Sequence, residues 1–279
     1  MPSQQALPQN IWAVANGKGG VGKTTLTATL GQLDAAAGRR VLIVDLDPQG
    51  TLAYDLGYEA DNEAGVELFD AVARRRPLKP TFRDVRPRLD VVAAGNDTHA
   101  LGVWLVSQPR SDANAPYRFA QAIETVAHEY DLVLIDCPPG ERALQEAALV
   151  ASRWLLIPTN ADAGSQAGLQ QMAARFNTAL EANPDLGLAG VVLTFVPASA
   201  GVIRDQALAE ITAAFGGDRD FLCKTVIRHA VKPAVTARGR GITVPELSDT
   251  APSNETAAKL AADYRELANE LLALEETNR

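Results

Sequence analysis

Hydrophobic residues along the chain gather in short continuous runs that alternate with longer segments of helical periodicity. The runs predict β-strands at Ile11–Asn16, Val41–Asp45, Leu89–Ala94, Asp131–Asp136, Trp154–Thr159, Gly190–Phe195 and Cys223–Ile227. Several runs are apolar at every position, which is typical of strands that helices cover on both faces. The alternation of strands and helices predicts an α/β fold with a doubly wound, mostly parallel sheet and helices on both faces.

The segments between these runs predict helices at Lys23–Ala37, Pro116–Glu129, Glu141–Ala151, Ser165–Glu181, Ile203–Phe215 and Asn254–Glu275. The last helix has one apolar stripe, formed by Leu260, Tyr264, Leu267, Leu271 and Leu274. The interval Leu52–Arg88 is the least regular and is expected to be an excursion between the second and third strands. Since no long linker interrupts the pattern, we expect a single domain over residues 11–279 after a short tail, residues 1–10.

Composition narrows the class of protein. The chain is 47% hydrophobic and 22% charged, which is ordinary for a soluble protein. It has no apolar run long enough to span a membrane and no signal-peptide pattern, so we expect a cytoplasmic protein. The two cysteines, Cys137 and Cys223, lie far apart and have no metal-type spacing, which makes a disulfide scaffold or a metal cluster an unfavoured interpretation.

The segment Gly17–Thr24 fits the phosphate-loop pattern G-x-x-x-x-G-K-[ST], and it lies between a predicted strand and a predicted helix, where this motif belongs. Backbone N–H groups of such a loop surround phosphates, and the start of the helix adds positive potential. Lys23 is expected to reach the β- and γ-phosphates, and the Thr24 hydroxyl to bind Mg²⁺. The predicted nucleotide-binding residues are Gly17, Lys18, Gly19, Gly20, Val21, Gly22, Lys23, Thr24 and Thr25.

Carboxylates follow two other predicted strands at the same edge of the sheet. Asp45 and Asp47 end the second run, and Asp136 ends the run "DLVLID". In a doubly wound sheet these strand ends lie beside the phosphate loop, so Asp47 and Asp136 are candidate metal residues with Thr24. The turn Pro138–Gly140 after Asp136 is either a sensor of the γ-phosphate or a plain connection to the next helix.

The segments "KGGVGKTT", "VLIVDLDPQG" and "DLVLIDCPP", in this order and spacing, resemble the ParA family of partition ATPases, within the deviant Walker A group that also contains MinD. The resemblance continues through "LLIPT", "GVVLT", "KTVIR" and "GITVPEL", and so covers nearly the whole chain. It implies a single P-loop ATPase domain with ATP and Mg²⁺ as cofactors. Lys18 is then the signature lysine of the group, Asp47 helps to position the attacking water, and Asp136 is the Walker B carboxylate.

The resemblance also implies partners and catalytic residues. Members form ATP-dependent homodimers, bind duplex DNA without sequence preference and respond to a ParB-type activator. The implied catalytic residues are Lys18, Lys23 and Asp47, with Lys18 acting on the nucleotide of the facing subunit because Lys23 already serves its own phosphates. The chain departs from many relatives after Ile227, where Arg228, His229 and Ala230 replace a proline and an asparagine, and this leaves the adenine contacts open.

Net charge is −8, yet one stretch, Phe221–Val244, contains basic residues and no acid. It is either a solvated loop or a surface that contacts the DNA backbone through Arg228, Lys232, Arg238 and Arg240. A second basic cluster, in Arg74–Arg88, is a weaker candidate. We expect an ATP-bound form associated with the nucleoid.

Two alternatives remain open: a MinD-like or cargo-positioning ATPase acting on a membrane or protein scaffold, and a metal-cofactor or electron-transfer ATPase. A membrane is disfavoured because the last helix carries an acidic polar face, with Glu255, Asp263, Glu266 and Glu270, and the tail adds Glu275 and Glu276.

Overall fold

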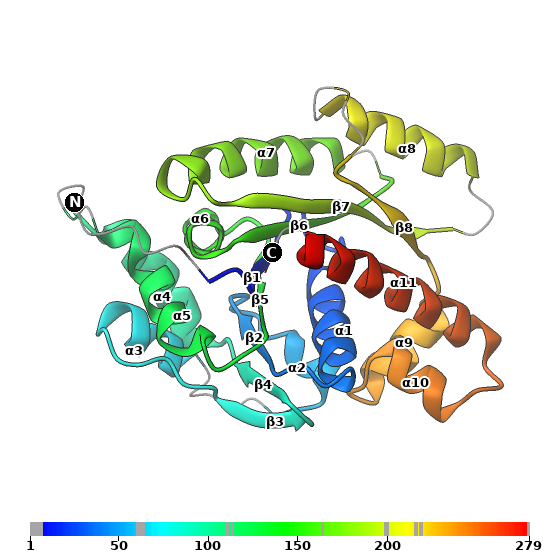
Figure 1. The fold of residues 1–279 in the computed structure, drawn as a ribbon, viewed down its shortest axis with the longest axis horizontal. Coiled ribbons are helices and arrows are strands. Elements are labelled where there is room, and N and C mark those ends of the chain that lie inside the picture. The colour runs from blue at the N-terminus through cyan, green and yellow to red at the C-terminus, as the bar shows by residue number, and fades with distance from the viewer. Residues whose placement is uncertain are drawn as a thin grey trace.

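The computed structural model describes residues 8–59, 65–109, 112, 114–162, 165–197, 201–214, 217 and 220–277. Within these residues one eight-stranded sheet has the strand order β3-β4-β2-β5-β1-β6-β7-β8 (Figure 1). The strands are β1 (Ile11–Val14), β2 (Val41–Asp45), β3 (Phe82–Arg86), β4 (Leu89–Val92), β5 (Leu132–Asp136), β6 (Trp154–Asn160), β7 (Gly187–Val196) and β8 (Leu222–Arg228). All neighbours are parallel except β3 and β4. The predicted α/β sheet is confirmed.

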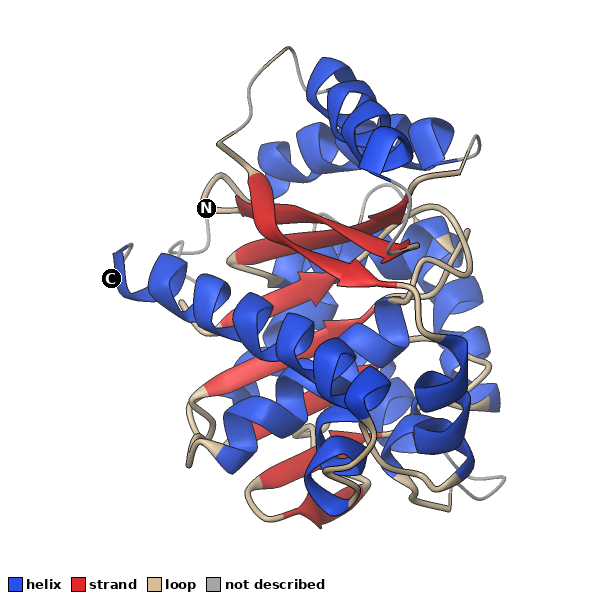
Figure 2. Cartoon of the chain, turned by 90° about the vertical axis from the view of Figure 1, so that its right-hand side faces the viewer, coloured by secondary structure: helices blue, strands red, loops and turns tan. Residues whose placement is uncertain are grey.

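Helices cover both faces of this sheet (Figure 2). One face carries α3 (Val66–Ala73), α4 (Asn96–Ser107), α5 (Arg118–Ala127), α6 (Arg142–Ala151), α7 (Ser165–Ala182) and α8 (Gly201–Ala214). The other carries α1 (Lys23–Ala36), α2 (Leu52–Leu56), α9 (Val231–Gly239), α10 (Val244–Thr250) and α11 (Glu255–Thr277). A short 3-10 helix, Ala115–Tyr117, precedes α5.

Strand residues alternate between the two resulting cores. Ile11 and Ala13 face the core under α3–α8, whereas Trp12 and Val14 face the core under α1 and α11. Every residue of β1 is therefore buried, which explains why the run is apolar throughout rather than alternating with polar residues.

Three regions differ from the sequence-based expectation. The interval Leu52–Arg88 contains α2, α3 and β3, and β3 forms an antiparallel pair with β4. The helices and the strand of this interval are too short to show a clear periodicity of hydrophobic residues in the sequence. Residues 96–107 form α4, and the part of the basic stretch that follows β8 forms α9 and reaches the first residue of α10 rather than a solvated loop. The Thr243 hydroxyl accepts a hydrogen bond from the Glu246 N–H and so caps the start of α10.

Helix α11 lies against the sheet through its predicted apolar stripe, in which Leu260, Tyr264, Leu267 and Leu271 are buried. The sequence suggested that the acids of this helix form one solvent-facing side, but the structure does not show this arrangement. The carboxylate of Glu270 accepts the N–H groups of Lys224 and Thr225 on β8, at 2.7 and 3.1 Å. These bonds satisfy backbone donors on the free edge of the outermost strand. None of the helices in the described ranges is both long and apolar enough to cross a membrane.

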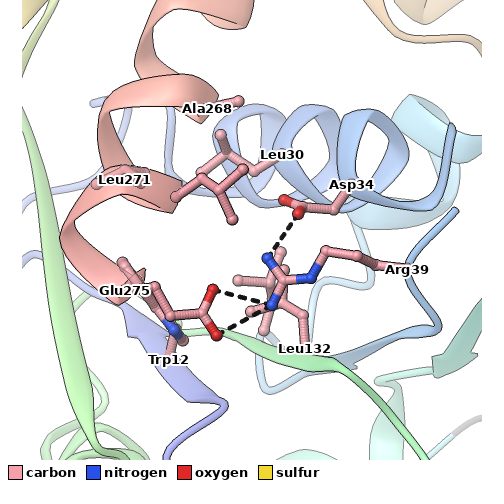
Figure 3. Close-up of a pocket in the computed structure, with 10 residues that line it drawn as sticks. Trp12, Leu30, Asp34, Arg39, Leu132, Ala268, Leu271 and Glu275 are labelled. Atoms are coloured by element: carbon pink, nitrogen blue, oxygen red, sulfur yellow. Dashed lines mark hydrogen bonds and ion pairs between the residues drawn. The ribbon is translucent and has the colours of Figure 1, made fainter. Parts of the chain in front are cut away.

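A charged cluster fastens the end of α11 to α1 (Figure 3). The Arg39 guanidinium donates to Asp34 Oδ1 at 2.8 Å, and its Nη2 lies 2.9 Å from Glu275 Oε2. The adjoining cavity has a volume of only about 20 Å³, so it holds no organic ligand. Glu275, expected on the polar tail, is instead buried by this contact.

Candidate functional site

The carboxyl ends of β1, β2 and β5 are neighbours in the sheet, and the loop between β1 and α1 lies at this edge. Gly22, immediately before α1, has φ +85°, a backbone conformation that favours glycine. A Cβ atom at Gly22 would lie 2.9 Å from Cζ of Phe195, which itself has φ +57°. The end of β7 thus closes over the loop, and a larger residue than glycine does not fit there.

The two lysines of the loop are held differently. Lys23 is buried, and its ammonium donates to the Lys18 carbonyl oxygen at 2.8 Å. Burial lowers the pKa of Lys23, while the nearby carboxylates of Asp136 and Asp47 partly oppose this shift. The Lys18 ammonium forms an ion pair with Asp162 and donates to the Asn160 side chain at 3.3 Å. In this structure the Lys18 side chain is therefore held by residues at the end of β6 in its own chain.

Asp136 has the chemistry of a metal ligand. Its side chain is fully buried, and neither carboxylate oxygen has a hydrogen-bond partner within the described residues. Its pKa is raised to about 7, chiefly by burial; the neighbouring Thr24 hydroxyl and Lys23 ammonium act to lower it, and the charges of Asp47 and Asp55 act to raise it. Buried carboxylate oxygens without partners fit a cation, which would supply the missing positive charge.

The strand register places Asp45 directly beside Asp136. Burial, followed by the charge of Asp136, raises the pKa of Asp45 well above its usual range. Its Oδ2 has no hydrogen-bond partner in the part of the chain that the structure describes. Its Oδ1 accepts the Asp47 N–H at 2.8 Å. The Asp47 carboxylate in turn accepts the Gln49 N–H at 3.0 Å. Asp45 thus holds the backbone of the loop that carries Asp47.

Among the described residues, no group of three or more histidines, cysteines or acids has the arrangement of a self-sufficient metal site. A cation here needs further oxygen ligands, as a nucleotide phosphate would provide. Cys137 and Cys223 are free and buried, and burial raises the pKa of both thiols, that of Cys223 to about 12. They have the environment of inert core residues.

A cavity of about 280 Å³ adjoins the start of α1. It extends from Thr25 and Asp55 past Phe195 to the residues after β8 and to Tyr264 on α11. The Thr25 hydroxyl donates to Asp55 at 3.3 Å, and the rings of Phe195 and His229 meet edge to face at 6.2 Å. The cavity is large enough for a nucleoside and continues directly from the phosphate loop. His229 and Ala230, whose role the sequence left open, line it.

The four basic candidates for DNA contact have different surroundings. Arg228 donates two hydrogen bonds of 2.6 Å to Asp263, whose side chain is only 8% exposed. Arg238 lies 4.0 Å from the buried Asp55 and stacks over Tyr54. Lys232 and Arg240 are exposed on and after α9. Arg228 is thus engaged with α11, whereas Lys232 and Arg240 face solvent.

The basic cluster in Arg74–Arg88 is also partly engaged. Arg74 and Arg76 both bind Asp70, and Arg86 binds Glu246 of α10. These ion pairs give the arginines structural partners, and the cluster remains a weaker candidate for DNA contact.

Sequence patterns alone did not identify several residues of the site. Asn16 donates to the Pro158 carbonyl at 2.8 Å and accepts the Lys18 N–H at 2.9 Å, so it anchors the start of the loop to β6. Asp162 could have been found, because it follows a strand that ends at the same edge as Asp136. Gln145 lies within α6, where no local pattern distinguishes it.

Known proteins resemble this chain over most of its length. A family model described as an AAA domain matches residues 9–188. The chromosome partitioning protein ParA of Myxococcus xanthus is 35% identical over 207 residues, which cover 74% of this chain and 71% of the relative. The sporulation initiation inhibitor protein Soj of Bacillus subtilis is 35% identical over 226 residues, which cover 80% of this chain and 85% of Soj.

A solved structure of cobyrinic acid a,c-diamide synthase from Mycobacterium smegmatis, with a bound ATP analogue and magnesium, superposes with a TM-score of 0.75 at 25% identity and covers 98% of both chains. Together with the identity to ParA and Soj, this likeness shows that the chain belongs to the ParA family of partition ATPases, in the deviant Walker A group of P-loop proteins.

Proposed function

We propose that this protein binds ATP and Mg²⁺, dimerises around the nucleotide, hydrolyses it slowly, and uses the ATP-bound dimer to hold duplex DNA while it positions a plasmid, chromosome or other cargo. The observation that carries the proposal is the phosphate loop beside Asp136, whose buried carboxylate oxygens have no hydrogen-bond partner among the described residues. The names of the relatives favour partition over the membrane and electron-transfer alternatives. A ParB-type protein is the proposed activator, and the nucleoid the proposed location of the ATP-bound form.

Each residue of the site has a distinct task in this proposal. Lys23 contacts the β- and γ-phosphates of its own nucleotide. The Thr24 hydroxyl and Asp136 would hold Mg²⁺, with Asp47 nearby, and the bound cation would supply positive charge against the phosphates. Asp47 orients the attacking water, and Asp45 keeps the Asp47 loop in place through the 2.8 Å hydrogen bond.

Lys18 acts in trans. Within one chain Lys23 already serves the phosphates, and Lys18 is bound by Asp162 and Asn160. Dimerisation brings a second triphosphate near this loop, and its negative charge competes with Asp162 for the ammonium. Lys18 then neutralises charge on the transferring phosphoryl group, as an arginine finger does.

DNA contact is assigned to the exposed surface around α9. Lys232 and Arg240 carry it, because their charges are available to phosphates, whereas Arg228 is held by Asp263. Binding of this type is electrostatic, independent of sequence and strongly weakened by salt.

The test compares the parent protein with Lys18→Ala and Lys23→Ala. We expect the parent to form a dimer with ATP and Mg²⁺ in light scattering and to release phosphate. Lys18→Ala should still bind ATP but stay monomeric and inactive, while Lys23→Ala should lose ATP binding. A parent that binds no ATP contradicts the proposal, and a Lys18→Ala variant that dimerises and turns over normally removes Lys18 from the mechanism.

A further inference from the structure

Gln145 occupies a fully buried position on α6, where its side-chain amide reaches two backbone carbonyls of the phosphate region. Its Nε2 donates to the Pro138 carbonyl oxygen and, at 3.3 Å, to that of Asn16. Pro138 lies two residues after Asp136, and Asn16 immediately precedes Gly17. One amide therefore joins the two chain segments that carry the Walker B carboxylate and the phosphate loop.

Arg175 on α7 fixes the orientation of this amide, since its Nη1 donates to Oε1 of Gln145. A guanidinium can only donate, and a backbone carbonyl can only accept. The chemistry of the three partners thus determines which end of the amide is oxygen and which is nitrogen. Arg175 is half-buried, and burial lowers its pKa, so the side chain is held inside the helix interface.

Helix α7 also touches the phosphate loop directly. A Cβ atom at Gly168 would lie 2.8 Å from Oδ1 of Asn16 and 3.0 Å from Cβ of Lys18, so the helix backbone approaches the loop as closely as a glycine allows. The same Asn16 oxygen accepts the Lys18 N–H. One helix therefore contacts the phosphate loop at Gly168 and, through Arg175 and Gln145, the loop after Asp136.

We propose that Gln145 is a positioning residue for ATP hydrolysis, and that Arg175 holds its amide in the orientation that ties the loop after Asp136 to the phosphate loop. The proposal rests on the proposed ATPase function. Without the amide, the carbonyls of Asn16 and Pro138 lose a buried donor, and the segment up to Gly140 loses its link to the phosphate loop. A displacement of about 1 Å at catalytic groups can cost about 10²-fold in rate.

Nucleotide binding should change less than turnover, because the hydrogen bonds of Gln145 go to the carbonyls of Asn16 and Pro138 and to Arg175. They do not involve the side chains that are proposed to hold the phosphates and Mg²⁺, namely Lys23, Thr24 and Asp136. This difference separates a positioning role from general destabilisation. We therefore expect kcat to fall while the Kd for ATP–Mg²⁺ stays within about threefold of the parent value.

Four variants test the link that the Gln145 amide makes between the phosphate loop and the loop after Asp136. Gln145→Leu keeps the approximate volume of the side chain and removes all three hydrogen bonds. Gln145→Glu keeps the acceptor for Arg175 but cannot donate to the carbonyls. Arg175→Met removes the donor to the amide, and Arg175→Lys restores a donor. Matched controls are the exposed residues Gln170 on α7 and Arg204 on α8, as Gln170→Leu and Arg204→Met.

Three quantities are measured: kcat with ATP–Mg²⁺, the Kd for a fluorescent ATP analogue, and hydrogen exchange in the nucleotide-free protein. The exchange measurement follows the backbone amides of Cys137, Gly140 and Glu141, since Pro138 and Pro139 have none. We expect Gln145→Leu and Gln145→Glu to lose about 10- to 100-fold in kcat and to exchange faster in this segment alone. Arg175→Met should lose less, and Arg175→Lys should recover most of the parent rate. The two control variants should match the parent.

A Gln145→Leu protein with kcat within twofold of the parent and unchanged exchange overturns the proposal. The proposal is also overturned if kcat and ATP affinity fall by the same factor and the melting temperature falls as well, because that pattern shows a merely structural role. Failure of the parent to hydrolyse ATP contradicts the proposed function instead, and the exchange measurement then still decides whether the amide tethers the loop.

Discussion

Replacing Arg39 by methionine should destabilise the protein, because the carboxylates of Asp34 and Glu275 then stay in place without their positive partner. Arg39 bridges Asp34 on α1 and Glu275 on α11, whose side chains are only 17% and 6% exposed (Figure 3). Methionine keeps much of the alkyl packing but supplies no positive charge. Breaking a buried pair costs about 3–5 kcal/mol because one charge stays buried without compensation. Since the Arg39 and Asp34 side chains retain some exposure, we expect a loss of about 3 kcal/mol near pH 8.

The loss should depend on pH in a defined direction. Burial raises the pKa of Asp34, and Arg39 opposes that shift. Without Arg39 the pKa of Asp34 rises further above its value in the unfolded chain. Ionised Asp34 then costs stability at high pH, whereas protonation removes the cost as pH falls through the raised folded-state pKa. The free-energy difference between parent and variant should therefore be smaller at pH 5 than at pH 8.

Urea unfolding at both pH values measures this difference, with melting temperature as a second readout. A loss of about 3 kcal/mol corresponds to a decrease of about 5 °C in melting temperature for a chain of this size. Arg40→Met is the matched control. The Arg40 side chain is 52% exposed, and its ion pair with Glu129 is long, at 3.9 Å. The expected loss of stability is below about 1 kcal/mol. Adding Asp34→Asn to Arg39→Met should recover part of the loss. A loss below about 1 kcal/mol at pH 8, or one independent of pH, would refute the reasoning.

Asp47→Ala should bind ATP but lose turnover and accumulate as a dimer, and phosphate release at the parent rate would show that Asp47 has another role. Lys232→Glu combined with Arg240→Glu should weaken ATP-dependent DNA binding in a salt titration and reduce the log–log slope by about 0.9 per lost phosphate contact; equal slopes would exclude this surface. Asp162→Ala should promote ATP-dependent dimerisation in light scattering by releasing the signature lysine, and an unchanged dimerisation midpoint would argue against competition. Glu270→Ala should cost about 1–3 kcal/mol in urea unfolding, because two backbone donors of β8 lose a charged acceptor; no measurable cost would contradict the edge contact.

The sequence alone indicated where the main strands lie along the chain, the phosphate-loop motif and the acids that follow the strands, whereas the order of the strands within the sheet came from the structure. The strand Val41–Asp45 has the predicted bounds, and α1 begins at the predicted Lys23. These features are readable because they are local: a buried strand is a short apolar run, and a phosphate loop needs glycines and a lysine at fixed spacing. The parallel sheet then brings Asp45 beside Asp136, because the carboxyl ends of parallel strands lie at the same edge of the sheet.

Only the tertiary structure decided which charged side chains are available for function. Arg228 was a candidate for DNA contact, but Asp263, 35 residues away in the chain, binds it. Glu270 and Glu275 were expected on a solvent-facing side, yet they bind β8 and Arg39. Gln145 lies 129 residues from the Asn16 carbonyl that it contacts. Helical periodicity describes the direction of a side chain around its own helix, whereas its partners depend on how distant elements pack together.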